Sequence, residues 1–127
     1  MIYDATDTTI NPNNRAGKYI LIDPTGKITK FNENENGEFV HERMKNCKIQ
    51  LENDQIIIDF KNSVMKFKKS ITDRFYLLKE INDLVNNKNI SISYIENTNF
   101  INEVTDNNEN VMSFEYDNAY LKEIKIN

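Results

Sequence analysis

Short runs in which apolar and polar residues alternate dominate this chain, and such alternation is typical of half-buried β-strands. The clearest run is residues 90–95, where isoleucine and tyrosine alternate with serine. Residues 47–51 follow the same period of two, and the more apolar run at residues 55–60 predicts a central strand. The pattern therefore predicts extended structure over most of the chain.

Turn-forming residues separate these runs and predict antiparallel hairpins. In Asp23-Pro24-Thr25-Gly26, proline at the second position and glycine at the fourth suit a type I turn. Asp117-Asn118 suits a tight hairpin turn. Together the runs predict about eight or nine short strands, at residues 18–23, 27–31, 38–42, 47–51, 55–60, 63–68, 90–95, 111–116 and 119–126.

Residues 72–86 have a different pattern, which predicts one helix. An apolar residue recurs there every three or four positions, which is the spacing of an amphipathic helix. The stripe consists of Ile71, Phe75, Leu78, Ile81 and Val85. Ser70 or Thr72 can cap its start, and the asparagines of residues 86–89 can end it because asparagine tolerates the left-handed conformation.

We therefore expect an α+β fold, namely a mainly antiparallel β-sandwich or partly open barrel with one α-helix packed across it near residues 72–86. A chain of 127 residues fits one domain, which we place at residues 18–127. Residues 4–17 hold few large apolar groups, and residues 1–17 are expected to form an extended N-terminal arm. Residues 96–110 are expected to form a long irregular loop.

Asparagine, isoleucine and lysine supply 21, 17 and 13 of the residues, and lysine outnumbers arginine by 13 to 3. All three have A/T-rich codons, so the composition resembles that of small proteins from phages of AT-rich bacteria, or from those bacteria themselves. The expected β-sandwich with one helix and a long loop is also similar to the fold of several tailed-phage tube, terminator and connector proteins. A likeness of fold does not by itself establish a function.

Charge and hydropathy exclude several classes of protein. A net charge of −4 gives no positive field to capture a phosphate backbone, which argues against nucleic-acid binding. No apolar run approaches the roughly 18 residues of a membrane span, and the first residues lack the features of a signal peptide. We therefore expect no membrane partner, no secretion by a signal peptide, and a location in a virion or the bacterial cytoplasm.

His41 and Cys47 are the only histidine and the only cysteine, so they are the candidates for catalysis. His41 lies beside charged residues on an expected strand edge, where a solvated side chain is the simpler interpretation. Cys47 is in phase with Ile49 and Leu51, which suits a small core residue. A Cys47–His41 pair is the enzymatic alternative. We expect no enzyme and no cofactor.

Two further patterns suggest ligands. Residues 32–37 resemble the start of a calcium loop, with oxygen donors at alternate places and Gly37 sixth, but Arg43 stands where a bidentate glutamate is needed. We therefore expect no metal. The basic cluster consists of Lys61, Lys66, Lys68 and Lys69. A lysine cluster with an aromatic residue such as Phe67 can bind single-stranded nucleic acid. Alternation puts Lys66 and Lys68 on the face opposite Phe67, however, so we favour a solvated strand face that discourages edge pairing.

We therefore expect a non-enzymatic assembly protein, in first place a small phage virion component at a head, neck or tail. Its partners are expected to be other protein subunits, in a homo- or hetero-oligomer, reached through the N-terminal arm and the loop at residues 96–110. The residues expected to bind partners are Ile2, Tyr3, Ile10, Arg15, Phe100 and Ile101. The alternative is a small acidic inhibitor or immunity-type protein that blocks a host or toxin protein by charge complementarity.

Overall fold

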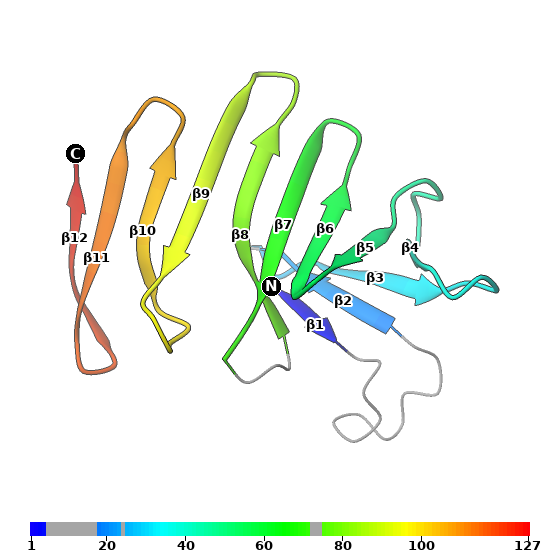
Figure 1. Ribbon diagram of the computed structural model, residues 1–127, viewed down its shortest axis with the longest axis horizontal. Helices are drawn as coiled ribbons and strands as arrows, with labels where there is room; N and C mark the ends of the chain where they lie inside the picture. Colours follow the sequence, from blue (N-terminus) through cyan, green and yellow to red (C-terminus); the bar gives the residue numbers. More distant parts are fainter. Residues whose placement is uncertain (5–17, 24, 72–74) are drawn as a thin grey trace.

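The protein is built from β-strands in the part of the chain that its computed structural model describes, which is residues 1–4, 18–23, 25–71 and 75–127. The strands are β1 (Ile2–Asp4), β2 (Lys18–Ile22), β3 (Ile28–Glu33), β4 (Phe39–His41), β5 (Ile49–Glu52), β6 (Gln55–Asp59), β7 (Ser63–Lys69), β8 (Phe75–Asp83), β9 (Lys88–Tyr94), β10 (Ile101–Asp106), β11 (Val111–Asp117) and β12 (Tyr120–Ile126). They pair antiparallel in one open sheet (Figure 1). The described ranges contain no helix with the length and apolar character needed to cross a membrane.

The sheet branches at β8. One edge of β8 pairs with β7 along its length, and β6 and β5 continue outward from there. The other edge pairs with β1 at Phe75 and Tyr76, and with β9 from Glu80 to Asp83. From this shared edge β1–β4 extend in one direction and β9–β12 in another.

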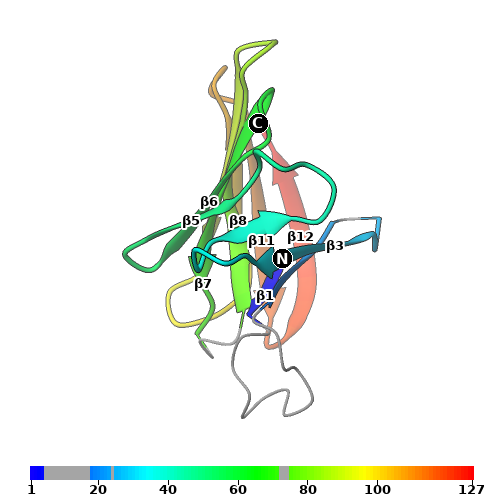
Figure 2. The same cartoon turned by 90° about the vertical axis from the view of Figure 1, so that its right-hand side faces the viewer.

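Strands β1–β4 form a second layer over β5–β8. They lie behind β5–β8 in Figure 1 and run across them, and Figure 2 shows the two layers from the side. The bridge between Val40 and Lys48 joins the end of β4 to the residue that precedes β5. The buried apolar side chains lie between these layers, and they are Ile2, Tyr19, Phe31, Cys47, Ile49, Ile56, Ile58, Phe67 and Tyr76. The core is therefore confined to the N-terminal part of the fold.

Asparagine residues close several hairpins with a backbone conformation that most other residues avoid. Asn53, Asn87 and Asn118 have φ values of 54°, 50° and 56°, in the left-handed region. Asparagine tolerates this region better than other residues with a Cβ, because its short side chain can bond to nearby backbone. The abundance of asparagine thus supports the tight turns of a meandering sheet.

Several predicted strands are confirmed. The hairpin around residues 23–26 joins β2 and β3, and the hairpin around Asp117 and Asn118 joins β11 and β12. The central apolar run becomes β6, in which Ile56 and Ile58 are fully buried. In each case the period of two places apolar side chains on one face of the sheet.

The predicted α+β fold is wrong, because the described chain is all-β in one open sheet and residues 75–83 of the predicted helix form β8. A bulge explains the error. Lys66 pairs with Glu80 and Phe67 with Leu78, so Lys79 is an extra residue. The bulge puts Leu78 and Ile81 on the same face at a spacing of three, which imitates a helix. Val85, the last residue of the predicted stripe, is exposed in the next turn.

The predicted loop at residues 96–110 is also wrong in part, because Ile101–Asp106 form β10. A second bulge hid this strand. Tyr94 pairs with Ile101 and Ser93 with Glu103, so Asn102 is the extra residue and the alternation is interrupted. Of the predicted arm, residues 2–4 form β1 inside the sheet, whereas residues 5–17 lie outside the described residues.

Candidate interaction surface

Strands β9–β12 form a single-layer sheet, here called the C-terminal sheet, whose two faces differ in chemistry. The strand register places Ile92 opposite Val104, Val104 opposite Met112, and Met112 opposite Ile126. Residues that stand directly opposite one another share a face, so these four form an apolar row across the sheet. Phe114 opposite Ile124 adds a parallel pair.

We call this side of the C-terminal sheet the apolar face. By register and alternation it consists of Ile90, Ile92, Tyr94, Ile101, Val104, Met112, Phe114, Tyr116, Leu121, Ile124 and Ile126. The opposite side carries the row Ser93, Glu103, Ser113 and Lys125. One side is therefore suited to apolar contact and the other to solvent.

The apolar face continues the face that builds the core. Phe67 and Met65 alternate along β7, Met65 stands opposite Ile81 on β8, and Ile81 stands opposite Ile90 on β9. Over β5–β8 this face is covered by β1–β4, whereas Figures 1 and 2 show no described strand over it at β9–β12. Among the described strands, the apolar face is therefore the part of the core-forming side that no second layer covers.

The outer part of the apolar face is open to solvent. The exposed fractions are 40% for Ile90, 51% for Leu121, 46% for Ile124 and 75% for Ile126. Single exposed apolar residues are common on soluble proteins, but contiguous apolar patches on one face usually mark a binding surface. The arrangement of these residues in rows makes this a patch.

Two hollows lie on the same side of the sheet. One has a volume of about 180 Å³ and is lined by Ile90, Val104, Met112 and Ile126, with parts of the β10–β11 turn. The other has a volume of about 470 Å³ and lies where the C-terminal sheet meets β1–β2, and its lining includes Leu21, Ile22, Phe67, Ile81, Ile92 and Tyr94. Apolar side chains of a partner would fit such hollows.

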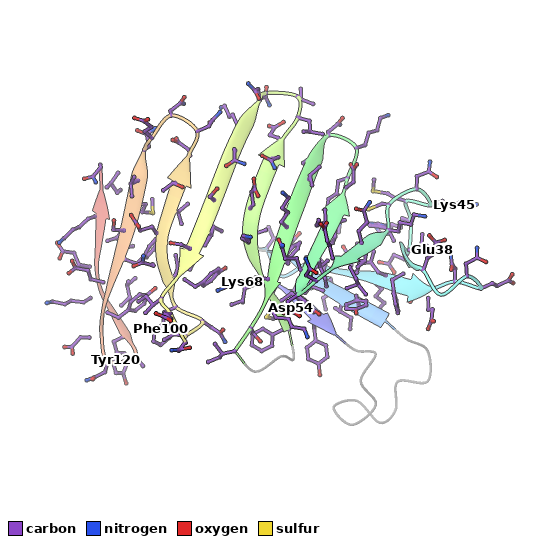
Figure 3. The ribbon with its side chains drawn as sticks, in the orientation of Figure 1. Glu38, Lys45, Asp54, Lys68, Phe100 and Tyr120 are labelled. Atoms are coloured by element: carbon purple, nitrogen blue, oxygen red, sulfur yellow. The ribbon has the colours of Figure 1, made fainter. Side chains whose placement is uncertain are left out.

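Aromatic residues lie along one border of the apolar face, the lower one in Figure 3. The Phe100 ring stacks on the Tyr116 ring at a centroid distance of 4.9 Å, and the Tyr116 hydroxyl donates a 2.8 Å hydrogen bond to the Ile101 carbonyl. Figure 3 shows Phe100 at the connection of β9 and β10, and Tyr120 at the same end of β12. Phe100 and Ile101, predicted from the sequence to bind partners, are therefore next to one another at this border.

The other residues predicted to bind partners lie elsewhere. Ile2 is fully buried and its side chain belongs to the core. Tyr3 is half-buried in β1, opposite Ile20 and Phe75. Ile10 and Arg15 lie outside the described residues. Of the four that the structure describes, only Phe100 and Ile101 lie at the border of the apolar face.

The imidazole of His41 is hydrogen-bonded to the backbone of the turn that follows β4. Its Nδ1 atom accepts hydrogen bonds from the backbone N–H groups of Arg43 and Met44, at 3.0 and 3.1 Å. Its ring meets the Phe31 ring edge to face at 5.3 Å. Burial lowers the pKa of His41 below its usual 6.5. The lowered pKa favours the neutral imidazole, whose Nδ1 atom can accept these hydrogen bonds and so stabilise the turn after β4.

Cys47 does not have the setting of a reactive thiol. Its exposed fraction is 2%, and burial, with the nearby Asp59 carboxylate, raises its pKa above 9.0. A hollow of about 410 Å³ beside it is lined also by Lys45, Lys48 and Lys61. The thiolate is the nucleophilic form, so a raised pKa disfavours nucleophilic chemistry here.

The basic cluster is largely paired with other groups. The Lys66 ammonium lies 3.5 Å from Glu80, and that of Lys69 lies 3.8 Å from Asp54. The Lys68 ammonium lies 4.6 Å from the centroid of the Tyr94 ring, and Figure 3 shows Lys68 near β8. These contacts reduce the charge that the cluster offers to an anionic ligand.

In the loop at residues 32–37, the side-chain oxygen of Asn34 is used within the loop. The side-chain carbonyl of Asn34 accepts hydrogen bonds from the backbone N–H groups of Asn36 and Glu38, at 3.0 and 2.9 Å. Glu38 is in turn paired with Lys48, and this pairing is the main cause of its lowered pKa. Across the described ranges, no group of three or more His, Cys, Asp or Glu residues could hold a metal ion.

The apolar residues of the C-terminal strands are visible in the sequence, but predicting the strands one by one did not reveal that these residues share one face. Residues 90–95, 111–116 and 119–126 were predicted as strands, but the strand that joins them, β10, was taken as a loop. Without β10 the rows across the sheet cannot be assembled. The five isoleucine, leucine and valine residues of β10 and β12, taken with the correct register, would have indicated the face.

Comparison with protein-family models, with curated proteins and with solved structures found no match for this chain. Its function is therefore inferred from its own residues and geometry.

Proposed function

We propose that this protein is a non-enzymatic assembly protein, which binds a protein partner through the apolar face of its C-terminal sheet. The observation that carries the proposal is that β1–β4 cover the core-forming side only over β5–β8. The same side continues over β9–β12, where no strand of the described ranges covers it and apolar residues are in register on every strand. A partner surface would complete this half of the fold.

Physical chemistry supports a protein partner. Removing apolar surface from water contributes about 25 cal/mol per Å², and the half-exposed side chains of this face retain such surface in the monomer. Charged side chains are concentrated on the opposite side of the sheet, for example Glu103, Glu115 and Lys125. Depletion of charge is typical of the centre of a protein interface.

The non-enzymatic part of the proposal is supported by His41 and Cys47. The His41 Nδ1 atom already accepts two backbone hydrogen bonds, and the Cys47 thiol is buried with a raised pKa. A nucleophile needs an accessible, activated group and a base that is free to take its proton.

The setting that we propose is a phage virion, at a head, neck or tail, with other protein subunits as partners. The support for this narrower form is the composition, in which asparagine, isoleucine and lysine with A/T-rich codons predominate. Subunits of such particles are held by extensive protein contacts, for which an uncovered sheet face is suited.

The proposal is tested with two neighbouring substitutions on β11. Met112→Lys puts a charge on the apolar face, whereas Ser113→Lys puts the same charge on the opposite face of the same strand. Tagged chains are expressed in the native source and recovered under native conditions, and cross-linking with mass spectrometry then maps the contacts of the partner. We expect contacts at β9–β12, loss of the partner with Met112→Lys, and retention with Ser113→Lys.

Circular dichroism of both variants provides the folding control. A partner that both folded variants retain equally would contradict the proposal, as would cross-links confined to the opposite face. A Met112→Lys variant that does not fold would be replaced by Ile90→Lys, because Ile90 is 40% exposed and the new side chain can reach solvent.

A further inference from the structure

The outer edge of β12 is an exposed sheet edge, distinct from the apolar face. In the part of the sheet that the structure describes, β12 stands at one end of the strand order and pairs only with β11. All its residues, Tyr120–Ile126, are exposed. A long exposed edge strand presents unpaired backbone N–H and C=O groups, and these are a template for another strand.

The direction of these backbone groups follows from one hydrogen bond. The backbone N–H of Asn127 donates to the Val111 carbonyl at 2.9 Å, so residue 127 faces β11. Residues alternate in the direction of their backbone groups along an antiparallel strand. Lys125 and Glu123 therefore also face β11, and Ile124 and Ile126 direct their N–H and C=O groups outward.

The side chains on this edge are complementary to themselves. When two copies of β12 run antiparallel about a two-fold axis at Ile124, each Ile124 stands opposite its equivalent. The same register places Glu123 of each copy opposite Lys125 of the other, on the polar side of the sheet. Opposite charges at facing positions stabilise a strand pair, and facing like charges destabilise it.

We propose that a second copy of this chain pairs with β12 through this edge, in the register centred on Ile124. The two Ile124 residues exchange both backbone hydrogen bonds, and each Glu123 pairs with Lys125 of the second copy. Because facing residues share a face, the apolar faces of the two copies join into one continuous surface. The inference rests on the proposed function only in that the joined surface would serve the same partner.

Two features of β12 that discourage edge pairing in other proteins do not block this register. The bulge lies at Lys122, since Glu123 pairs with Glu115 and Leu121 with Tyr116, so residues 123–126 remain regular. Lys125 is held by Glu115 of its own sheet, with 2.8 Å between the ammonium and the carboxylate. Its side chain therefore lies along the polar side of the sheet and leaves the backbone edge accessible.

Charge variants test the register. Sedimentation velocity of the purified chain over a range of concentrations is expected to show a reversible monomer–dimer equilibrium. Glu123→Lys puts lysine opposite Lys125 twice in the dimer and is expected to weaken dimerisation by about tenfold. The double variant Glu123→Lys, Lys125→Glu restores opposite charges at both positions and is expected to restore the wild-type dissociation constant.

Backbone variants test the pairing itself. Ile124→Pro removes an N–H that faces outward, which a folded edge strand tolerates, and is expected to abolish the dimer. Ile124→Ala keeps the N–H and is expected to keep the dimer. Ile124→Cys is expected to form a disulfide-linked dimer, because facing residues at such a pair are about 5.5 Å apart. Asn108→Cys, on the exposed β10–β11 turn, is the control and is not expected to form a disulfide-linked dimer.

The outcomes separate this inference from the proposed function. A chain that stays monomeric at every concentration overturns the inference and leaves binding of a different partner to the apolar face standing. A dimer that Met112→Lys abolishes, and that the edge variants do not affect, means that two copies pack face to face, which also overturns the inference. An edge-dependent dimer whose partner binding is unchanged by Met112→Lys supports the inference and contradicts the proposed function.

Discussion

The hydroxyl group of Tyr94 donates a hydrogen bond of 2.5 Å to the backbone carbonyl of Leu78. The two residues lie where β9 separates from β8, beyond the last pair between Ser91 and Glu80. The β1 strand pairs with the same edge of β8 only at Tyr76 and Phe75. A side chain thus supplies the contact in the gap between the two branches of the sheet.

Tyr94→Phe should destabilise the protein by about 1 kcal/mol, because a half-buried carbonyl loses its partner while the ring remains. Lys68 keeps its aromatic partner in this variant. Equilibrium unfolding in urea measures the change. Tyr120→Phe is the matched control, since Tyr120 is exposed on β12, and we expect a change of less than about 0.5 kcal/mol. Equal effects in both variants would contradict a role of the hydroxyl at the branch.

Protonation of His41 should reduce stability between pH 7 and about pH 5. Its pKa is lowered in the folded state, mainly by burial, so the unfolded chain binds the proton more readily. The contribution of His41 is therefore complete above the unfolded pKa of about 6.5 and is lost as the pH falls through the lower folded pKa. Urea unfolding at a series of pH values measures this slope.

His41→Asn is the control for this pH dependence. The asparagine carbonyl can accept the backbone N–H groups of Arg43 and Met44 but does not titrate. We expect the slope in this window to flatten, while the slope below about pH 4.5 remains. The lower slope comes from carboxylates whose pKa is lowered by hydrogen bonds or ion pairs, such as Glu80, Asp106 and Glu115. An unchanged slope between pH 5 and 7 would contradict the role of His41.

The Cys47 thiol should react slowly with a thiol reagent in the folded protein and rapidly after unfolding. Its side chain is buried and its pKa is raised, so both access and the thiolate fraction are low. Absorbance after addition of an aromatic disulfide reagent measures the rate with and without guanidinium. The variant Asn108→Cys supplies an exposed thiol for comparison. Rapid reaction of Cys47 in the folded chain would reopen the enzymatic interpretation.

Shortening a side chain to alanine should reduce the free energy of unfolding much more in the buried core than on the apolar face. Ile58→Ala removes a fully buried side chain between the layers, and we expect a loss of about 3 kcal/mol. Ile126→Ala truncates a 75% exposed side chain on the apolar face, and we expect a change within about 0.5 kcal/mol. Thermal and urea unfolding of the monomer measure both. A large effect of Ile126→Ala in a monomer would mean that the apolar face is covered within its own chain.

The strands with uninterrupted alternation were predictable from the sequence. β6, β9 and β11 follow a period of two along their length, and β12 does so from Glu123 onward, because each places one set of side chains on one face. The turns were also predictable where asparagine or glycine permits a positive φ, as at Asn118 and Gly26. These features depend only on neighbours along the chain.

The positions of the bulges and the choice of which strands cover which face were decided only by the tertiary structure. The bulges at Lys79 and Asn102 arise where each strand pairs with the strand before it, and they replace the period of two with a spacing of three. Which side the described strands leave open depends on β1 pairing with β8 at Phe75 and Tyr76, a contact between residues about 70 positions apart. Composition and alternation carry no information about which strand covers which face, because that choice is made by packing between distant segments.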